Sequence, residues 1–170
     1  GNHIDLYYNP LQLKSNSEHK DGSLLKKTQY YRTGEIKEVQ VLKDLFNTFT
    51  QHNRNGEVIA VYKEKTDPDS YTTINEGTQI LYNSEIGKED LMEFKYVYKD
   101  SSLFELYEYS SEGTLKQLTE YNDYYPTKVT YFDKKGQKES ELIYNESGSP
   151  QDGIEKSENI NRVYSNGNLV

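Results

Sequence analysis

The sequence predicts an all-β fold: an antiparallel meander of tandem β-hairpin repeats that forms an elongated, single-layered or curved sheet. The main observation is a recurring phrase, in which an aromatic residue is followed after two or three residues by a glycine, and it recurs at Gly34, Gly113, Gly136 and Gly167. Such repetition at hairpin spacing is typical of a tandem β-repeat. The chain also has 17 Tyr and a single Ala in 170 residues, a composition that disfavours helices.

The glycines are spaced as hairpins would space them. Gly34 and Gly56 lie 22 residues apart, and Gly113 and Gly136 lie 23 apart. Two strands of about eight residues and two short turns take up that length. Glycine supplies the positive φ of a tight turn, and the Asn-Gly pairs at 55–56 and 166–167 are strong hairpin signals. Each phrase therefore predicts a turn followed by its exit strand.

Alternation of apolar and polar residues predicts the strands between these turns. At 92–98, Phe94 and Tyr96 share one face, while Glu93 and Lys95 take the other, as in a half-buried strand. The stretch 103–109 carries apolar or aromatic groups on both faces. We expect about ten strands in meander order, the others being at 24–31, 36–43, 57–64, 78–83, 114–121, 127–132, 137–144 and 160–164.

Three stretches depart from this rhythm. A loop-rich insertion is expected at 65–77, because Pro68 cannot donate to a strand ladder. A long surface loop is expected at 145–161, where Asn, Glu, Ser, Gly and Pro dominate. At 39–49 a helix remains an alternative to a strand, since the spacing of the apolar residues fits one helical face over about three turns.

Composition indicates a thin core in a single repeat-built domain over 1–170. The hydrophobic fraction is 33% with all the tyrosines included. Counted without tyrosine and with glycine it is about 29%, against the roughly 45–50% usual in globular domains by that count. Tyrosine buries an apolar ring while its hydroxyl stays wet, which suits a sheet that is half exposed to water.

Charge and residue usage exclude several classes of function. The formal charge of −8 disfavours binding to nucleic acids and to anionic membranes. Without cysteine there are no disulfides, thiolate zinc sites or cysteine nucleophiles. No apolar run is long enough to insert into a membrane. Because the chain starts with Gly1 instead of Met, we expect a signal peptide or lipid anchor to have been removed from an exported or cell-surface protein; a cytoplasmic location is the alternative.

The segment Tyr30-Tyr31-Arg-Thr-Gly34-Glu-Ile36 resembles the repeat of the MORN-variant family of bacterial proteins similar to YwqK-type antitoxins. Two further copies begin at Asn53 and Tyr164, and Gly113 and Gly136 belong to copies with one extra turn residue. The Trp that precedes the tyrosine pair in many family repeats does not occur in this chain. The resemblance implies extended antiparallel sheets and interaction roles, and it transfers no catalytic residue. The bare phrase also resembles the YD repeats of secreted shell-forming proteins.

Motifs for catalysis, metals and cofactors do not stand out. His3, His19 and His52 belong to no metal-ligand motif, and solvated histidines are the better interpretation. No nucleophile elbow and no phosphate-binding glycine loop occurs. The acidic pairs Asp67 with Asp69 and Glu139 with Glu141 could bind calcium or act in glycoside hydrolysis, but we expect solvated faces. We predict no catalytic residue, no metal and no cofactor.

The tyrosines of successive predicted strands are the one candidate binding surface. Cross-strand side chains in a meander approach to about 5 Å, which is close enough for rings to stack. A row of rings could bind a sugar face or a peptide edge, but the rings could instead form the core that the few aliphatic residues cannot supply. The residues are Tyr107, Tyr109, Tyr121, Tyr131 and Tyr144.

The expected function is a non-enzymatic interaction module with a protein or carbohydrate partner and no nucleic acid partner. The alternative is a cytoplasmic antitoxin-like or immunity protein, whose negative surface would neutralise a basic partner. A polysaccharide-cleaving enzyme is the third possibility. Alternating Lys and Glu would protect the sheet edges, so we expect a monomer.

Overall fold

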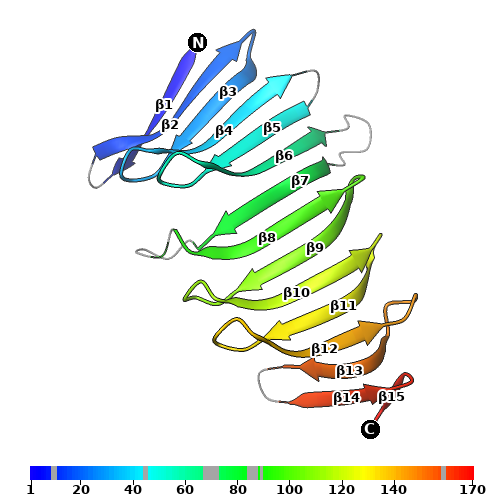
Figure 1. Ribbon diagram of the computed structural model, residues 1–170. Helices are drawn as coiled ribbons and strands as arrows, with labels where there is room; N and C mark the ends of the chain where they lie inside the picture. Colours follow the sequence, from blue (N-terminus) through cyan, green and yellow to red (C-terminus); the bar gives the residue numbers. More distant parts are fainter. Residues whose placement is uncertain (9–10, 44–45, 67–72, 84–87, 89, 158–159) are drawn as a thin grey trace. The chain divides into compact units, whose positions relative to one another are not determined.

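The computed structural model describes residues 1–8, 11–43, 46–66, 73–83, 88, 90–157 and 160–170. Fifteen strands are found in these ranges, and no helix. Each strand pairs antiparallel with the next one along the chain, in one open meander sheet (Figure 1). The predicted all-β hairpin meander is confirmed.

The chain forms two compact units, an N-terminal unit at Gly1–Gln79 and a C-terminal unit at Ile80–Val170. The boundary falls within β7 (Thr73–Tyr82). The strands before it are β1 (Asn2–Tyr8), β2 (Leu11–Lys20), β3 (Ser23–Tyr30), β4 (Ile36–Lys43), β5 (Phe46–His52) and β6 (Val58–Thr66). Those after it are β8 (Met92–Lys99), β9 (Ser102–Tyr109), β10 (Leu115–Asn122), β11 (Tyr125–Phe132), β12 (Lys138–Tyr144), β13 (Pro150–Lys156), β14 (Asn161–Ser165) and β15 (Asn168–Leu169).

Five hairpin turns share one backbone geometry. In each, the first residue donates its N–H to the carbonyl four residues later and accepts the N–H of the glycine three residues later. The glycines have φ between +75° and +102°, which L-residues rarely adopt. The copies of the repeated phrase at Gly34, Gly113 and Gly136 are therefore one repeated turn, whereas the copy at Gly167 has a different turn. The turns begin at Tyr31, Asn53, Ser110, Asp133 and Asn145.

The predicted Asn-Gly turns differ from each other. At Asn166-Gly167 both residues have positive φ, 50° and 79°, as a two-residue hairpin requires. Asn55 keeps an ordinary negative φ, and only Gly56 of that pair is left-handed. The chain turns there over five residues because the Asn53 side chain accepts the N–H groups of Asn55 and Glu57.

The helix considered at 39–49 is wrong in the described residues of that stretch. β4 and β5 form a hairpin in which Val39 lies opposite Thr50 and Gln40 opposite Phe49. β-Branched Val39 and Val41 favour an extended chain, and strand pairing satisfies the backbone.

The loop expected at 145–161 is also wrong, because β13 lies within it and pairs with β12 and β14. Pro150 is its first residue, a position where the missing N–H is tolerated. In the expected insertion at 65–77, β6 continues to Thr66 and β7 starts at Thr73. Positions 67–72, with Pro68, lie outside the described residues.

Each unit buries a small set of side chains, most of them on one face of its strands. In the N-terminal unit, Phe49 stacks on Tyr62 with ring centroids 4.4 Å apart. In the C-terminal unit, Val129 and Leu142 are 4% and 0% exposed and lie directly opposite each other. The core is thin, as predicted.

Candidate binding face

Strand register defines two faces in the C-terminal unit, because directly opposite residues share a face. One buried row runs from Thr119 through Val129 and Leu142 to Gly153. Six tyrosines lie on this same face, which we call the tyrosine face. They are Tyr96, Tyr98, Tyr121, Tyr131, Tyr144 and Tyr164.

Three of the five tyrosines expected in one row lie on the tyrosine face: Tyr121, Tyr131 and Tyr144. Since β-strand side chains alternate, each of these tyrosines shares the face of the buried-row residue two positions away on its strand. The charges of Tyr131, Tyr121 and Tyr164 all contribute to raising the pKa of Tyr144, after desolvation as the main cause. The structure therefore brings these rings together.

Tyr107 lies on the opposite face, so the expected single row is wrong. It lies opposite Lys95 and Leu118, and the Lys95 ammonium is 4.5 Å from its ring centroid. Its hydroxyl donates to Glu105. Tyr109 lies opposite Leu115, between the β9–β10 turn and a shift in the register of these two strands.

Three members of the tyrosine face, Tyr96, Tyr98 and Tyr164, were not among the predicted site residues. All three carried a signal in the sequence. Tyr96 and Tyr98 belong to the clearest alternating stretch, and Tyr164 begins a copy of the repeated phrase. Register alone places them with the others.

The rings both cover the core and face solvent. Tyr121, Tyr131 and Tyr144 are half-buried. They lie beside the row in which Thr119 and Val129 are buried. Desolvation is the main cause that raises the pKa of each of the three hydroxyls. Part of each ring therefore remains accessible to a partner.

Two carboxylates stand among these rings. Glu108 accepts a hydrogen bond from Gln117 Nε2 at 3.0 Å, and no described residue forms an ion pair with it. After desolvation, its charge helps to raise the pKa of Tyr96 and Tyr121. Glu155, in contrast, accepts from Tyr164 Oη at 3.1 Å and from Arg162 at 3.2 Å.

A groove of about 370 Å³ opens beside Tyr131. It combines aromatic surface with hydrogen-bonding groups of both kinds, so it can hold a polar ligand or side chain. Its lining residues are Glu108, Lys116, Gln117, Tyr131, Phe132, Lys156 and Ser157.

The N-terminal unit carries a polar row in place of a tyrosine face. In direct register across β1 to β5 lie Asp5, Ser15, Gln29, Glu38 and Gln51. Ser15 Oγ donates to Asp5 at 2.9 Å, and both glutamine amides donate to Glu38 at 3.1 Å. Burial is the main cause that raises the pKa of Glu38. This row satisfies its own hydrogen bonds.

The other polar residues considered in the sequence lie apart. His3 Nε2 is 3.2 Å from Asp5 Oδ1, while Glu139 pairs with Lys156 and Glu141 with Lys138. Asp67 and Asp69 lie outside the described residues. In the described ranges no three metal-ligating side chains gather, and no helix could cross a bilayer.

The acidic charge is concentrated in the C-terminal unit. Its sequence has ten Lys and Arg against seventeen Asp and Glu, a net charge of −7 out of the total of −8.

Comparison with known proteins finds no family model that matches the chain and no curated protein that matches it.

Proposed function

We propose that this protein is a non-enzymatic binding module that holds a protein partner on the tyrosine face. The observation that carries this proposal is the gathering of half-buried Tyr121, Tyr131 and Tyr144 on one face. Glu108 lies near Tyr121 and Tyr131, beside the groove. Tyrosine supplies a large contact area at a low entropic cost, and it is enriched at protein interfaces. Carbohydrate is the other partner that such rings could bind.

The proposal includes the alternative role of neutralising a basic partner. The net charge of −7 in the C-terminal unit favours it, because complementary charge steers association and suppresses wrong partners. The proposed MORN-variant relationship is supported by the shared turn geometry of four of its five copies, those at Gly34, Gly56, Gly113 and Gly136. Export stays a prediction, and fractionation of cells that produce the native protein would test it.

Quantitative affinity capture from the native cell tests the proposed face. The bait is compared with a Tyr131→Ser variant and with a Tyr107→Ser control on the opposite face. We expect a protein that the parent and the control capture equally and that Tyr131→Ser loses. Equal capture by all three baits would contradict the proposal, and binding of the parent to glycans alone would replace a protein partner by a carbohydrate.

A further inference from the structure

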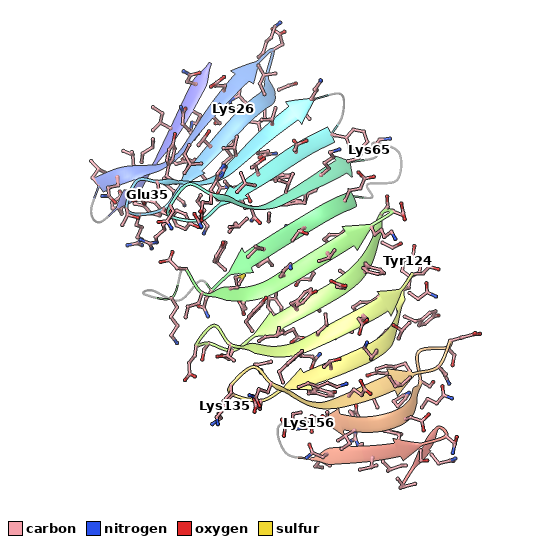
Figure 2. All side chains as sticks on the ribbon, viewed as in Figure 1. Lys26, Glu35, Lys65, Tyr124, Lys135 and Lys156 are labelled. Atoms are coloured by element: carbon pink, nitrogen blue, oxygen red, sulfur yellow. The ribbon has the colours of Figure 1, made fainter. Side chains whose placement is uncertain are left out.

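Exposed aromatic rings also lie along one edge of the C-terminal unit. The turns after β8, β10 and β12 share this edge, because turns alternate between the two edges of a meander. Tyr124 is 87% and Tyr125 54% exposed, and Phe104 is 44% exposed. Figure 2 shows Tyr124 at the tip of the β10–β11 hairpin.

Each of the three turns adds one exposed carboxylate: Asp100, Asp123 and Glu146. No described residue forms a hydrogen bond or an ion pair with these side chains. The nearby cation, Lys99, lies over the Phe104 ring at 5.6 Å from its centroid. The turns therefore present negative charge beside rings that can hold a cation. We call the three carboxylates and three rings the acidic turn edge.

Two hollows lie between successive turns along this edge. One, of about 220 Å³, is lined by Asp100, Phe104 and Asp123 among others. The second, of about 320 Å³, is lined by Tyr125, Tyr144 and Glu146 among others, and both include Asn122. A partner on this edge therefore also reaches rings of the tyrosine face.

Sheet geometry sets the interval between the carboxylates. Turns on the same edge are two strands apart, and strands are about 4.7–4.9 Å apart, so the interval is roughly 9.5 Å. A polyproline II chain repeats every three residues at about 3.1 Å each, roughly 9.3 Å. A β-extended segment repeats a face every two residues, at about 6.7 Å. The polyproline II repeat therefore matches the interval between the carboxylates, and the repeat of a β-extended segment does not.

We propose that the acidic turn edge binds an extended basic polypeptide segment with Lys or Arg at every third residue. This inference rests on the proposed binding function and names the chemistry of the partner. Charge complementarity selects this occupant, because the edge offers three carboxylates that no described residue pairs, and the unit has a net charge of −7. A second copy of the chain would bring like charge to it.

Fluorescence anisotropy with synthetic peptides tests the spacing. The probe is Lys-Pro-Pro repeated four times, and the control peptide has the same composition with Lys at alternate positions, so both form polyproline II. We expect the first to bind roughly fivefold tighter or more, and the binding to weaken between ~20 and ~150 mM salt. Equal affinity of the two peptides, or no binding at low salt, would overturn the proposal.

A triple variant, Asp100→Asn/Asp123→Asn/Glu146→Gln, tests the carboxylates. Asp100 and Asp123 have φ of 50° and 54°, which Asn tolerates as well as Asp. The turns are therefore kept while three charges are removed. We expect roughly a tenfold loss of affinity for the Lys-Pro-Pro peptide.

The matched control, Glu93→Gln/Glu112→Gln/Glu139→Gln, removes three exposed charges from the same unit and should lose less than about threefold. Equal losses in the two triple variants would overturn the edge as the binding site. In that case the capture experiment with Tyr131→Ser still decides the proposed function, so the two failures are distinguishable.

Discussion

Gly153 lies directly opposite Leu142, the fully buried side chain of the C-terminal unit. Gly153 has a φ of +111°, and a Cβ there would lie 2.1 Å from the carbonyl oxygen of Glu141. Only a glycine lets β13 approach β12 so closely, and this approach covers Leu142.

Gly153→Ala is therefore expected to destabilise the protein by about 2–4 kcal/mol, through the backbone clash and the left-handed φ together. Denaturant unfolding measures the loss. Gly56→Ala is the control, because Gly56 has a φ of +82° with open space around its Cβ position, and it should lose only about 1–2 kcal/mol. Equal losses would show that the close approach is unimportant.

The Asp133 side chain should stabilise one of the five turns that share a backbone geometry. Asp133 Oδ1 accepts the N–H groups of Lys135 and Gln137 at 2.8 and 2.9 Å. Asp133→Ala should cost about 1 kcal/mol in thermal or denaturant unfolding, while Asp133→Asn, which keeps the acceptor, should cost a few tenths at most. If Ala and Asn behave alike, the side chain does not stabilise the turn.

The Tyr107 hydroxyl should lose its proton only at high pH. Desolvation, followed by its hydrogen bond and charge interaction with Glu105, raises its pKa to about 12. The folded state therefore holds this proton more tightly, so its stabilising effect is complete below pH 10 and is lost as the pH rises towards 12. Glu105→Gln should lower the pKa of Tyr107, measured from the NMR shift of its ring carbon.

Glu112→Gln is the control for that titration. Glu112 lies in an exposed turn, so this substitution should leave the pKa of Tyr107 unchanged. A Tyr107 curve that is the same in Glu105→Gln and in the parent would remove Glu105 as a cause.

Glu38 should make the N-terminal unit sensitive to pH. Burial is the main cause that raises its pKa above 4.5, so the folded state favours the protonated acid. This contribution is complete below pH 4.5 and is lost as the pH rises through the folded-state pKa. Relative to the parent, Glu38→Gln should therefore gain stability as the pH rises from about 4 to 7. A stability difference that does not change with pH would contradict this.

The fold class was predictable because its signals are local. Glycines at hairpin spacing and the scarcity of alanine indicate turns and strands without any knowledge of packing. β2 was missed because its buried residues, Ser15 and Ser17, are polar. Such positions cannot be read as a core from hydrophobicity, since Ser15 is accommodated by its hydrogen bond to Asp5.

The tyrosine face was only partly predictable, because the register of β9 and β10 shifts by one residue between Leu115 and Gln117. Without that shift, pairing continued from Tyr109 and Leu115 would put Tyr107 opposite Gln117, on the face of Tyr121. With it, Tyr107 lies opposite Leu118.

The amino-acid sequence by itself determined that the chain is a meander of hairpins and where its glycine turns lie, since turn chemistry depends on a few adjacent residues. Only the tertiary structure decided which tyrosines gather around Glu108 and which carboxylates share the acidic turn edge. The physical reason is that side chains alternate with a period of two, so one extra residue in a strand moves every following side chain to the other face.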